Sequence, residues 1–173
     1  MLCETIKRWK NVILLCLLIF LVGVTMGIIS GYLKNYNAFK PEEARMKDIF
    51  LNNIKTCIFI IVSGLLTGGI LSSLVLLING YIIGLVIYGV MLNYGLVPLL
   101  TGLMPHFFIE LTAIVFCATI GFMSSIYFFM YIGKLNRLPF SRFVKDGFIL
   151  ILVSVLLLLS ASWIEDYISR VTL

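Results

Sequence analysis

Long hydrophobic runs, separated by short polar stretches, dominate the pattern of this chain. The runs cover about residues 12–32, 54–78, 81–103, 105–133 and 147–164. An α-helix needs about 20 apolar residues to cross the hydrocarbon core of a membrane, and each run is close to or above that length. We therefore predict an all-α fold, a polytopic transmembrane helix bundle of about five spans. Residues 1–173 are expected to form a single transmembrane domain.

Two polar segments, residues 33–53 and 79–80, predict further structural features. Residues 33–53 form the one sizeable polar stretch, and Pro41 followed by two glutamates is typical of a helix start. A short amphipathic helix on the membrane surface is expected over residues 42–53. Asn79 and Gly80 form a tight-turn signal, which is expected to end the second span.

The third hydrophobic run differs from the others because helix-breaking residues interrupt it. These residues are Asn93, Gly95, Pro98 and Gly102. The segment 81–103 is therefore either a kinked span or two half-helices that form a re-entrant loop. The choice affects the topology. We favour a crossing third segment, which gives five spans and places the N-terminus in the cytoplasm by the positive-inside rule. A re-entrant segment would change the parity and place the N-terminus outside.

The first run follows three basic residues, as the hydrophobic region of a signal peptide does. The run is too long for a typical signal peptide, and no A-x-A cleavage site ends it. We interpret it as an uncleaved first span.

Composition narrows the class of protein. Hydrophobic residues make up 61% of the chain and charged residues 12%, about half the usual globular share of roughly 25%. A soluble enzyme, a disordered protein and a nucleic-acid-binding domain are therefore excluded. The formal net charge of +5 indicates loops that face anionic lipid, so membrane lipids are expected partners and nucleic acid is not.

Few residues of the chain are candidates for a catalytic or metal-binding site. The single histidine, His106, excludes the HExxH zinc motif, and no GxxxxGK[ST] loop occurs, so an ATP-driven step would need the ATPase of a partner. No serine lies in a GxSxG elbow, although a serine nucleophile with His106 as its base is an alternative. The four cysteines, at positions 3, 16, 57 and 117, form no CxxC pair. We predict no disulfide framework, no metal site and no cofactor.

His106 and Glu110 form the most informative pair. Their spacing places both side chains on one helix face. Glu110 lies inside the fourth run, and an ionisable residue within a span is a candidate functional residue by default. It could relay protons, bind the amine of a peptide or pair with another subunit. The structural alternative is that Glu110 favours the N-terminal dipole of a helix that begins at Pro105, or pairs with Lys55 or Arg45.

Glycines recur at a four-residue spacing, which lets helix backbones approach closely in a membrane. The faces are Gly23, Gly27 and Gly31, then Gly64 and Gly68, then Gly80 and Gly84. Packing within the chain is favoured over a homo-oligomer contact. Asn53 and Asn79 flank the second run and are expected to cap its ends.

Basic residues gather between the fourth and fifth runs, at positions 134, 137, 142 and 145. Ordinary positive-inside bias is the favoured interpretation of this loop. The alternative is that the loop docks an anionic partner or lipid headgroups.

Four short motifs follow one another along residues 48–168. They are Phe50-Leu51-Asn52-Asn53, Asn79-Gly80-x-x-x-Gly84, Leu103-Met104-Pro105-His106 with Glu110 one turn later, and Trp163-Ile164-Glu165. In this order they resemble the stage II sporulation protein M family of multi-pass bacterial and archaeal membrane proteins. Members of that family commonly have glycine after the Pro-His pair, where this chain has Phe107. The resemblance implies a prokaryotic plasma membrane protein.

The resemblance implies two biological settings. In spore formers, the family's namesake is thought to anchor peptidoglycan-degrading proteins during engulfment. Short members accompany an ATPase and small hydrophobic proteins in the maturation, export or immunity of circular bacteriocins. The compact length of this chain is more similar to the second group.

Three functional hypotheses follow from these observations. The leading one is a non-enzymatic membrane subunit that handles a hydrophobic peptide together with other membrane subunits and an ATPase, with His106 and Glu110 at a polar site within the bundle. The first alternative is a membrane anchor for envelope remodelling, with partner contacts in the loop 33–53. The second is a membrane-embedded peptidase or ligase whose site is shared with another chain.

Overall fold

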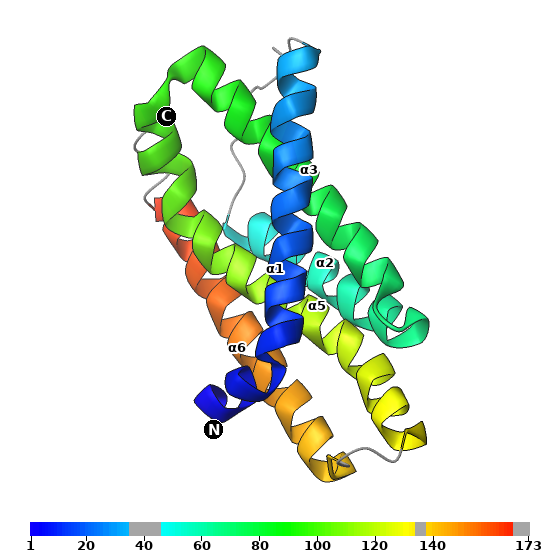
Figure 1. Cartoon of the computed structure of the whole chain (residues 1–173). Coiled ribbons are helices and arrows are strands. Elements are labelled where there is room, and N and C mark those ends of the chain that lie inside the picture. Colours follow the sequence, from blue (N-terminus) through cyan, green and yellow to red (C-terminus); the bar gives the residue numbers. More distant parts are fainter. Residues whose placement is uncertain (35–45, 134–137, 168–173) are drawn as a thin grey trace.

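The computed structural model describes residues 1–34, 46–133 and 138–167, and within these ranges the chain is helical without strands. The elements are α1 (Leu2–Leu33), α2 (Met46–Thr67), α3 (Ile70–Tyr94), the short α4 (Leu96–Pro98), the π-helix η1 (Leu99–Leu103), α5 (Met104–Ile132) and α6 (Phe140–Tyr167) (Figure 1). Five of them, α1, α2, α3, α5 and α6, are long and apolar enough to cross a membrane. The predicted all-α polytopic bundle is confirmed.

The five long helices alternate in direction along the chain. α1, α3 and α6 run one way, and α2 and α5 run the other way (Figure 1). The N-terminus, the turn at Gly68–Gly69 and the first residue of α6 therefore share one end, which we call the N-terminal end. Lys34 and the last residue of α6 lie at the opposite end.

The second helix ends earlier than its hydrophobic run suggests. α2 stops at Thr67, and Gly68 and Gly69 follow with φ angles of 67° and 91°. Glycine adopts this left-handed region at little cost, so the pair permits a turn inside an apolar run. The turn predicted at Asn79 and Gly80 is wrong, because both residues lie inside α3.

Asn79 does not cap a helix end either. Its side-chain amide donates a 2.8 Å hydrogen bond to the carbonyl oxygen of Val75, one turn earlier in α3. The separate surface helix predicted for residues 42–53 is also wrong in its described part, because residues from Met46 onward form the continuous start of α2. Residues 42–45 lie outside the described residues.

The interruption predicted in segment 81–103 is found at Gly95. This glycine has a φ of 82° and ends α3. The chain then passes through α4 and η1 directly into α5. Pro105 is the second residue of α5, directly after η1, where its fixed φ suits a helical backbone.

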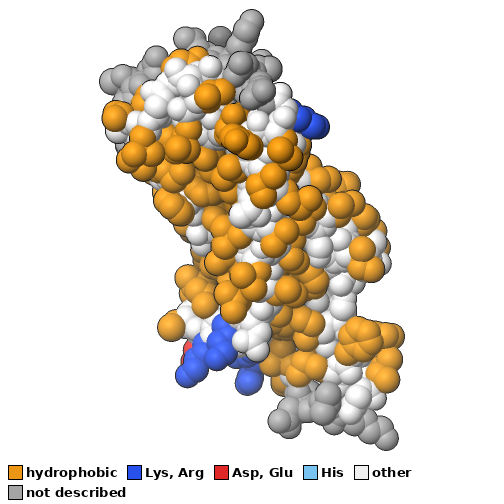
Figure 2. Space-filling model, turned by 45° about the horizontal axis from the view of Figure 1, so that its top comes forward, with side chains coloured by type: hydrophobic (Ala, Val, Ile, Leu, Met, Phe, Trp, Pro, Cys, Tyr) orange, Lys and Arg blue, Asp and Glu red, His pale blue; other side chains and the backbone are white. Residues whose placement is uncertain are grey.

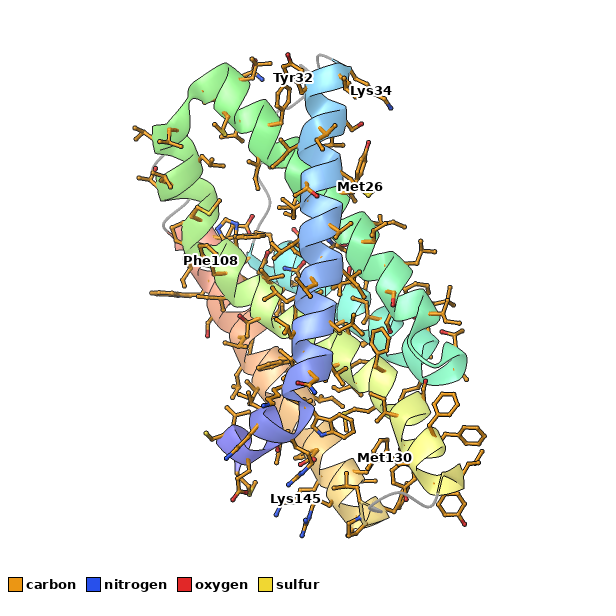
Figure 3. The ribbon with its side chains drawn as sticks, in the orientation of Figure 1. Met26, Tyr32, Lys34, Phe108, Met130 and Lys145 are labelled. Atoms are coloured by element: carbon orange, nitrogen blue, oxygen red, sulfur yellow. The ribbon has the colours of Figure 1, made fainter. Side chains whose placement is uncertain are left out.

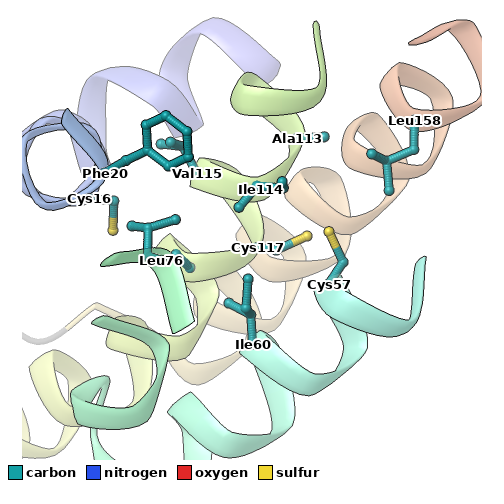
Figure 4. Packing of buried hydrophobic residues seen from close by; sticks show 11 residues of the cluster. Cys16, Phe20, Cys57, Ile60, Leu76, Ala113, Ile114, Val115, Cys117 and Leu158 are labelled. Atoms are coloured by element: carbon teal, nitrogen blue, oxygen red, sulfur yellow. The ribbon is translucent and has the colours of Figure 1, made fainter. Parts of the chain in front are cut away.

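α5 forms the centre of the bundle. Every residue from Ala113 to Gly121 is buried, as expected of a helix that is surrounded on all sides. Figure 4 shows the apolar core around this stretch, where side chains of α1, α2, α3 and α6 meet those of α5. On the outside, hydrophobic side chains cover the face shown in Figure 2, as contact with lipid requires.

Glycines join α1 to α3. A Cβ atom at Gly23 or Gly27 would collide with the backbone of α3, and a Cβ atom at Gly80 or Gly84 would collide with the backbone of α1. Gly31 lies against the ring of Tyr88. The preference for packing within the chain therefore holds for these two faces.

The third glycine pair behaves differently. Gly64 lies against Gly121 of α5 and Ser72 of α3, whereas Gly68 forms the turn. The Ser72 hydroxyl donates a 2.7 Å hydrogen bond to the carbonyl oxygen of Ile60 in α2, which joins these helices further. Gly64 and Gly68 thus do not form one packing face.

One spacing relates the two parallel helix pairs. Gly23 meets Gly80 and Gly27 meets Gly84 between α1 and α3, while Gly64 meets Gly121 between α2 and α5. In each case the partners lie 57 positions apart (23 to 80, 27 to 84, 64 to 121). This shared register is what two consecutive helix pairs, α1–α2 and α3–α5, produce when they pack as parallel repeats.

Candidate functional site

A hydrogen bond between Asn53 and Glu110 forms the centre of the candidate site. The Nδ2 of Asn53, in α2, donates to the Oε1 of Glu110, in α5, at 2.5 Å. Glu110 lies six residues after Met104, which begins α5. That is about 9 Å along the helix axis at 1.5 Å per residue. The pair therefore lies within two spanning helices, and it follows the 57-residue register of the glycine contacts.

Apolar side chains surround this polar pair. Phe50 and Ile54, on either side of Asn53, pack against the central core, as do Phe107 and Leu111 on either side of Glu110. The ring of Phe107 also lies 6.1 Å from that of Phe20 in α1. Polar groups in such surroundings gain from pairing with each other, since water is scarce there.

Two further predicted residues belong to this region. His106 lies one turn before Glu110 on the same face of α5, and it is only 6% exposed. Glu165, two residues before the end of α6, acts on Glu110 electrostatically as a like charge. The site therefore draws side chains from α2, α5 and α6, at the end of the bundle opposite the N-terminus.

Other predicted positions serve the fold rather than this site. Gly80 and Gly84 contact α1, and Asn79 bonds within α3. Glu110 also has a different partner from the two basic residues considered as alternatives, Lys55 and Arg45. Lys55 is exposed, the observed partner is the amide of Asn53, and Arg45 lies outside the described residues.

The chemistry of the pair follows from its partners. A neutral amide orients a carboxyl group without cancelling its charge, whereas a lysine or arginine would do both. Glu165 adds negative charge nearby. The arrangement suits the binding of a proton or a protonated amine. In the described ranges, histidine, cysteine and acidic side chains form no group of three that could hold a metal ion.

A second polar cluster, which was not predicted from the sequence, lies at the N-terminal end. Asp146 of α6 accepts hydrogen bonds from Thr5 Oγ1 and Trp9 Nε1, both at 3.0 Å, and pairs with the guanidinium of Arg8. The signal was the spacing of Thr5, Arg8 and Trp9, which places all three on one face of α1. It was overlooked because Asp146 lies far along the chain and just outside the predicted last span.

Comparisons with known proteins place most of the chain in one group. A family model described as Stage II sporulation protein M matches residues 16–170, which include all four residues of the candidate site. The chain is similar to Uncharacterized protein MJ0793 of Methanocaldococcus jannaschii, with 28% identity over 171 residues, covering 92% of this chain and 94% of that protein. No solved structure matches the chain.

Proposed function

Because this chain belongs to the stage II sporulation protein M family, we propose that it is a non-enzymatic, multi-pass subunit of a plasma-membrane complex that handles a hydrophobic peptide. The setting is the maturation, export or immunity of a circular bacteriocin, and a separate ATPase supplies energy. The absence of a GxxxxGK[ST] motif from the sequence supports this division of labour. The observation that carries the proposal is the Asn53–Glu110 pair within the spans.

The pair suits recognition of a peptide amine. A hydrophobic peptide enters the bilayer readily, but its terminal amine or a lysine side chain needs a partner there. Glu110 supplies a carboxyl group that Asn53 holds in place, and Glu165 adds a second carboxyl group to the region. A bound cation therefore meets the carboxyl group of Glu110, which the neutral amide of Asn53 holds in place.

The position of the pair supports the same function. Asn53 and Glu110 occupy equivalent positions of the consecutive helix pairs α1–α2 and α3–α5, since their contact keeps the 57-residue register. In transporters built from such repeats, substrates bind at the interface between the repeats. A peptide-binding role for this interface fits that pattern.

Affinity purification from native membranes in mild detergent, followed by mass spectrometry, tests the proposal. Wild-type chain is expected to bring along a nucleotide-binding subunit and a small hydrophobic peptide. Glu110→Gln is expected to retain the nucleotide-binding subunit and lose the peptide. Asp48→Asn, a matched change at an exposed acid of α2, should retain both.

Two results would contradict the proposal. One is recovery of a peptidoglycan-cleaving protein with neither the nucleotide-binding subunit nor the peptide, which would favour an envelope anchor. The other is cleavage or joining of a precursor peptide by the purified chain alone, which would favour an enzyme.

A further inference from the structure

A second site lies at the N-terminal end of the bundle, where α1 and α6 begin. A cavity of about 410 Å³ opens between them, and its lining includes Arg8, Arg142, Lys145 and Asp146. Figure 2 shows lysine and arginine side chains gathered over one end of the molecule, and Figure 3 shows Lys145 at the end where α1 begins. Basic side chains thus line much of the cavity. The cavity lies at the end of the bundle opposite the candidate site.

One wall of this cavity is fixed by the Asp146 cluster. Asp146 is 3% exposed and Thr5 is 1% exposed. Three donors, from Thr5, Arg8 and Trp9, hold the carboxylate. Because Arg8 already neutralises Asp146, this wall contributes shape and rigidity rather than free charge.

The other wall carries two basic side chains that form no ion pair in the described residues. Arg142 and Lys145 are exposed, and no carboxylate within the described part of the chain pairs with either side chain. Their spacing places both on the face of α6 that also carries Ile149, a third lining residue. Both lie near the start of α6, where the helix dipole adds positive potential. Glu4 is the remaining acid of the lining.

We propose that this cavity binds the phosphate group of an anionic phospholipid. Arg142 and Lys145 contact the phosphate from α6, and Arg8 borders it from α1. Basic pockets between spanning helices bind anionic headgroups in this way. The proposal rests on the cavity and its charges, and is independent of the peptide-handling function.

A lipid fits better than a phosphate in solution because apolar surface continues from the cavity. Val144, Phe148 and Leu152 of α6 are exposed, at a spacing that places them along one side of the helix next to the basic residues. Acyl chains can lie along these residues while the phosphate occupies the cavity. A free phosphate would gain nothing from them.

Lipid titration of the purified full chain in detergent tests the proposal. The probes are short-chain phosphatidylglycerol, short-chain phosphatidylcholine and inorganic phosphate. Wild-type chain should bind phosphatidylglycerol in preference to the other two. The double variant Arg142→Gln, Lys145→Gln should raise the apparent Kd for phosphatidylglycerol by roughly tenfold or more. Both side chains are exposed, so the variant should fold.

The matched control is the double variant Lys34→Gln, Lys47→Gln. It removes the same charge from exposed lysines away from the N-terminal end, and it should bind phosphatidylglycerol as wild type does. An equal loss in both double variants would overturn the proposal, since net charge alone would then explain binding. Equal binding of phosphatidylcholine would also overturn it, as would binding of inorganic phosphate without any preference for phosphatidylglycerol.

Discussion

The two ends of the bundle each hold a carboxyl group in a hydrogen bond between helices, and the two settings are opposite in character. Asp146 accepts from Thr5, Trp9 and the cationic Arg8, and is almost fully buried. Glu110 accepts from the neutral amide of Asn53, with Glu165 as a like charge nearby.

The difference separates a structural acid from a candidate functional one. A carboxylate whose charge is matched by a cation and by two further donors stabilises the contact between α1 and α6. A carboxyl group that a neutral amide holds in place, as Asn53 holds Glu110, keeps the capacity to bind a cation from outside. Substitutions at the two ends should therefore affect stability and activity in opposite proportions.

The largest loss of stability is expected from Asp146→Ala. It leaves Thr5 and Trp9 without their acceptor and Arg8 without its partner, so the free energy of unfolding should fall by about 3 kcal/mol. Unfolding of the purified protein in detergent measures this loss. Glu4→Ala, at an exposed acid of the same end, is the control, and an equal loss in the two variants would refute the structural role of Asp146.

A smaller loss of stability is expected from Gly64→Val. Gly64 lies in the contact between α2 and α5, the two helices that carry Asn53 and Glu110. The added side chain would collide with Ser72 and the backbone of Gly121, so a cost of about 1–3 kcal/mol is expected. Gly147→Val is the matched control, because nothing lies within 4 Å of a Cβ atom there. Cysteine cross-linking between α2 and α5 would report the register, and an unchanged pattern in a fully stable Gly64→Val protein would contradict this packing.

The smallest loss of stability is expected from Glu110→Gln. Glutamine keeps an oxygen that can accept the amide of Asn53, and polar pairs between membrane helices contribute about 0.6 kcal/mol on average. The free energy of unfolding should therefore change by less than about 1 kcal/mol. A loss as large as that of Asp146→Ala, measured in the same detergent, would assign Glu110 to the fold instead.

The sequence predicted the parts of this fold that follow from local pattern. Five hydrophobic helices, the break in segment 81–103 and the close packing of the Gly23–Gly27 and Gly80–Gly84 faces all come from spacing along one helix. The turn at Gly68–Gly69 was misplaced because both flanking segments are equally apolar, so hydrophobicity gives no boundary there. Asn79 and Gly80 were misread because glycine serves close approach as often as it serves turns.

The sequence predicted the shared helix face of the candidate site but not the partner of Glu110. The spacing of His106 and Glu110 indicated one helix face, but the partner of Glu110 depends on how α2 and α5 pack. Asn53 was therefore named as a cap rather than a hydrogen-bond donor. The Asp146 cluster escaped for the same reason, since its members lie at the two ends of the chain.

Peptide release from cells that carry Glu110→Gln is the decisive measurement for a peptide-binding role of Glu110. The released hydrophobic peptide, quantified by mass spectrometry, is divided by the amount of chain in the membrane, with Asp48→Asn as the matched control. Glu110→Gln is expected to abolish release at a normal protein level, and the control is expected to release the peptide as wild type does. Wild-type release from Glu110→Gln would contradict the assignment of this site.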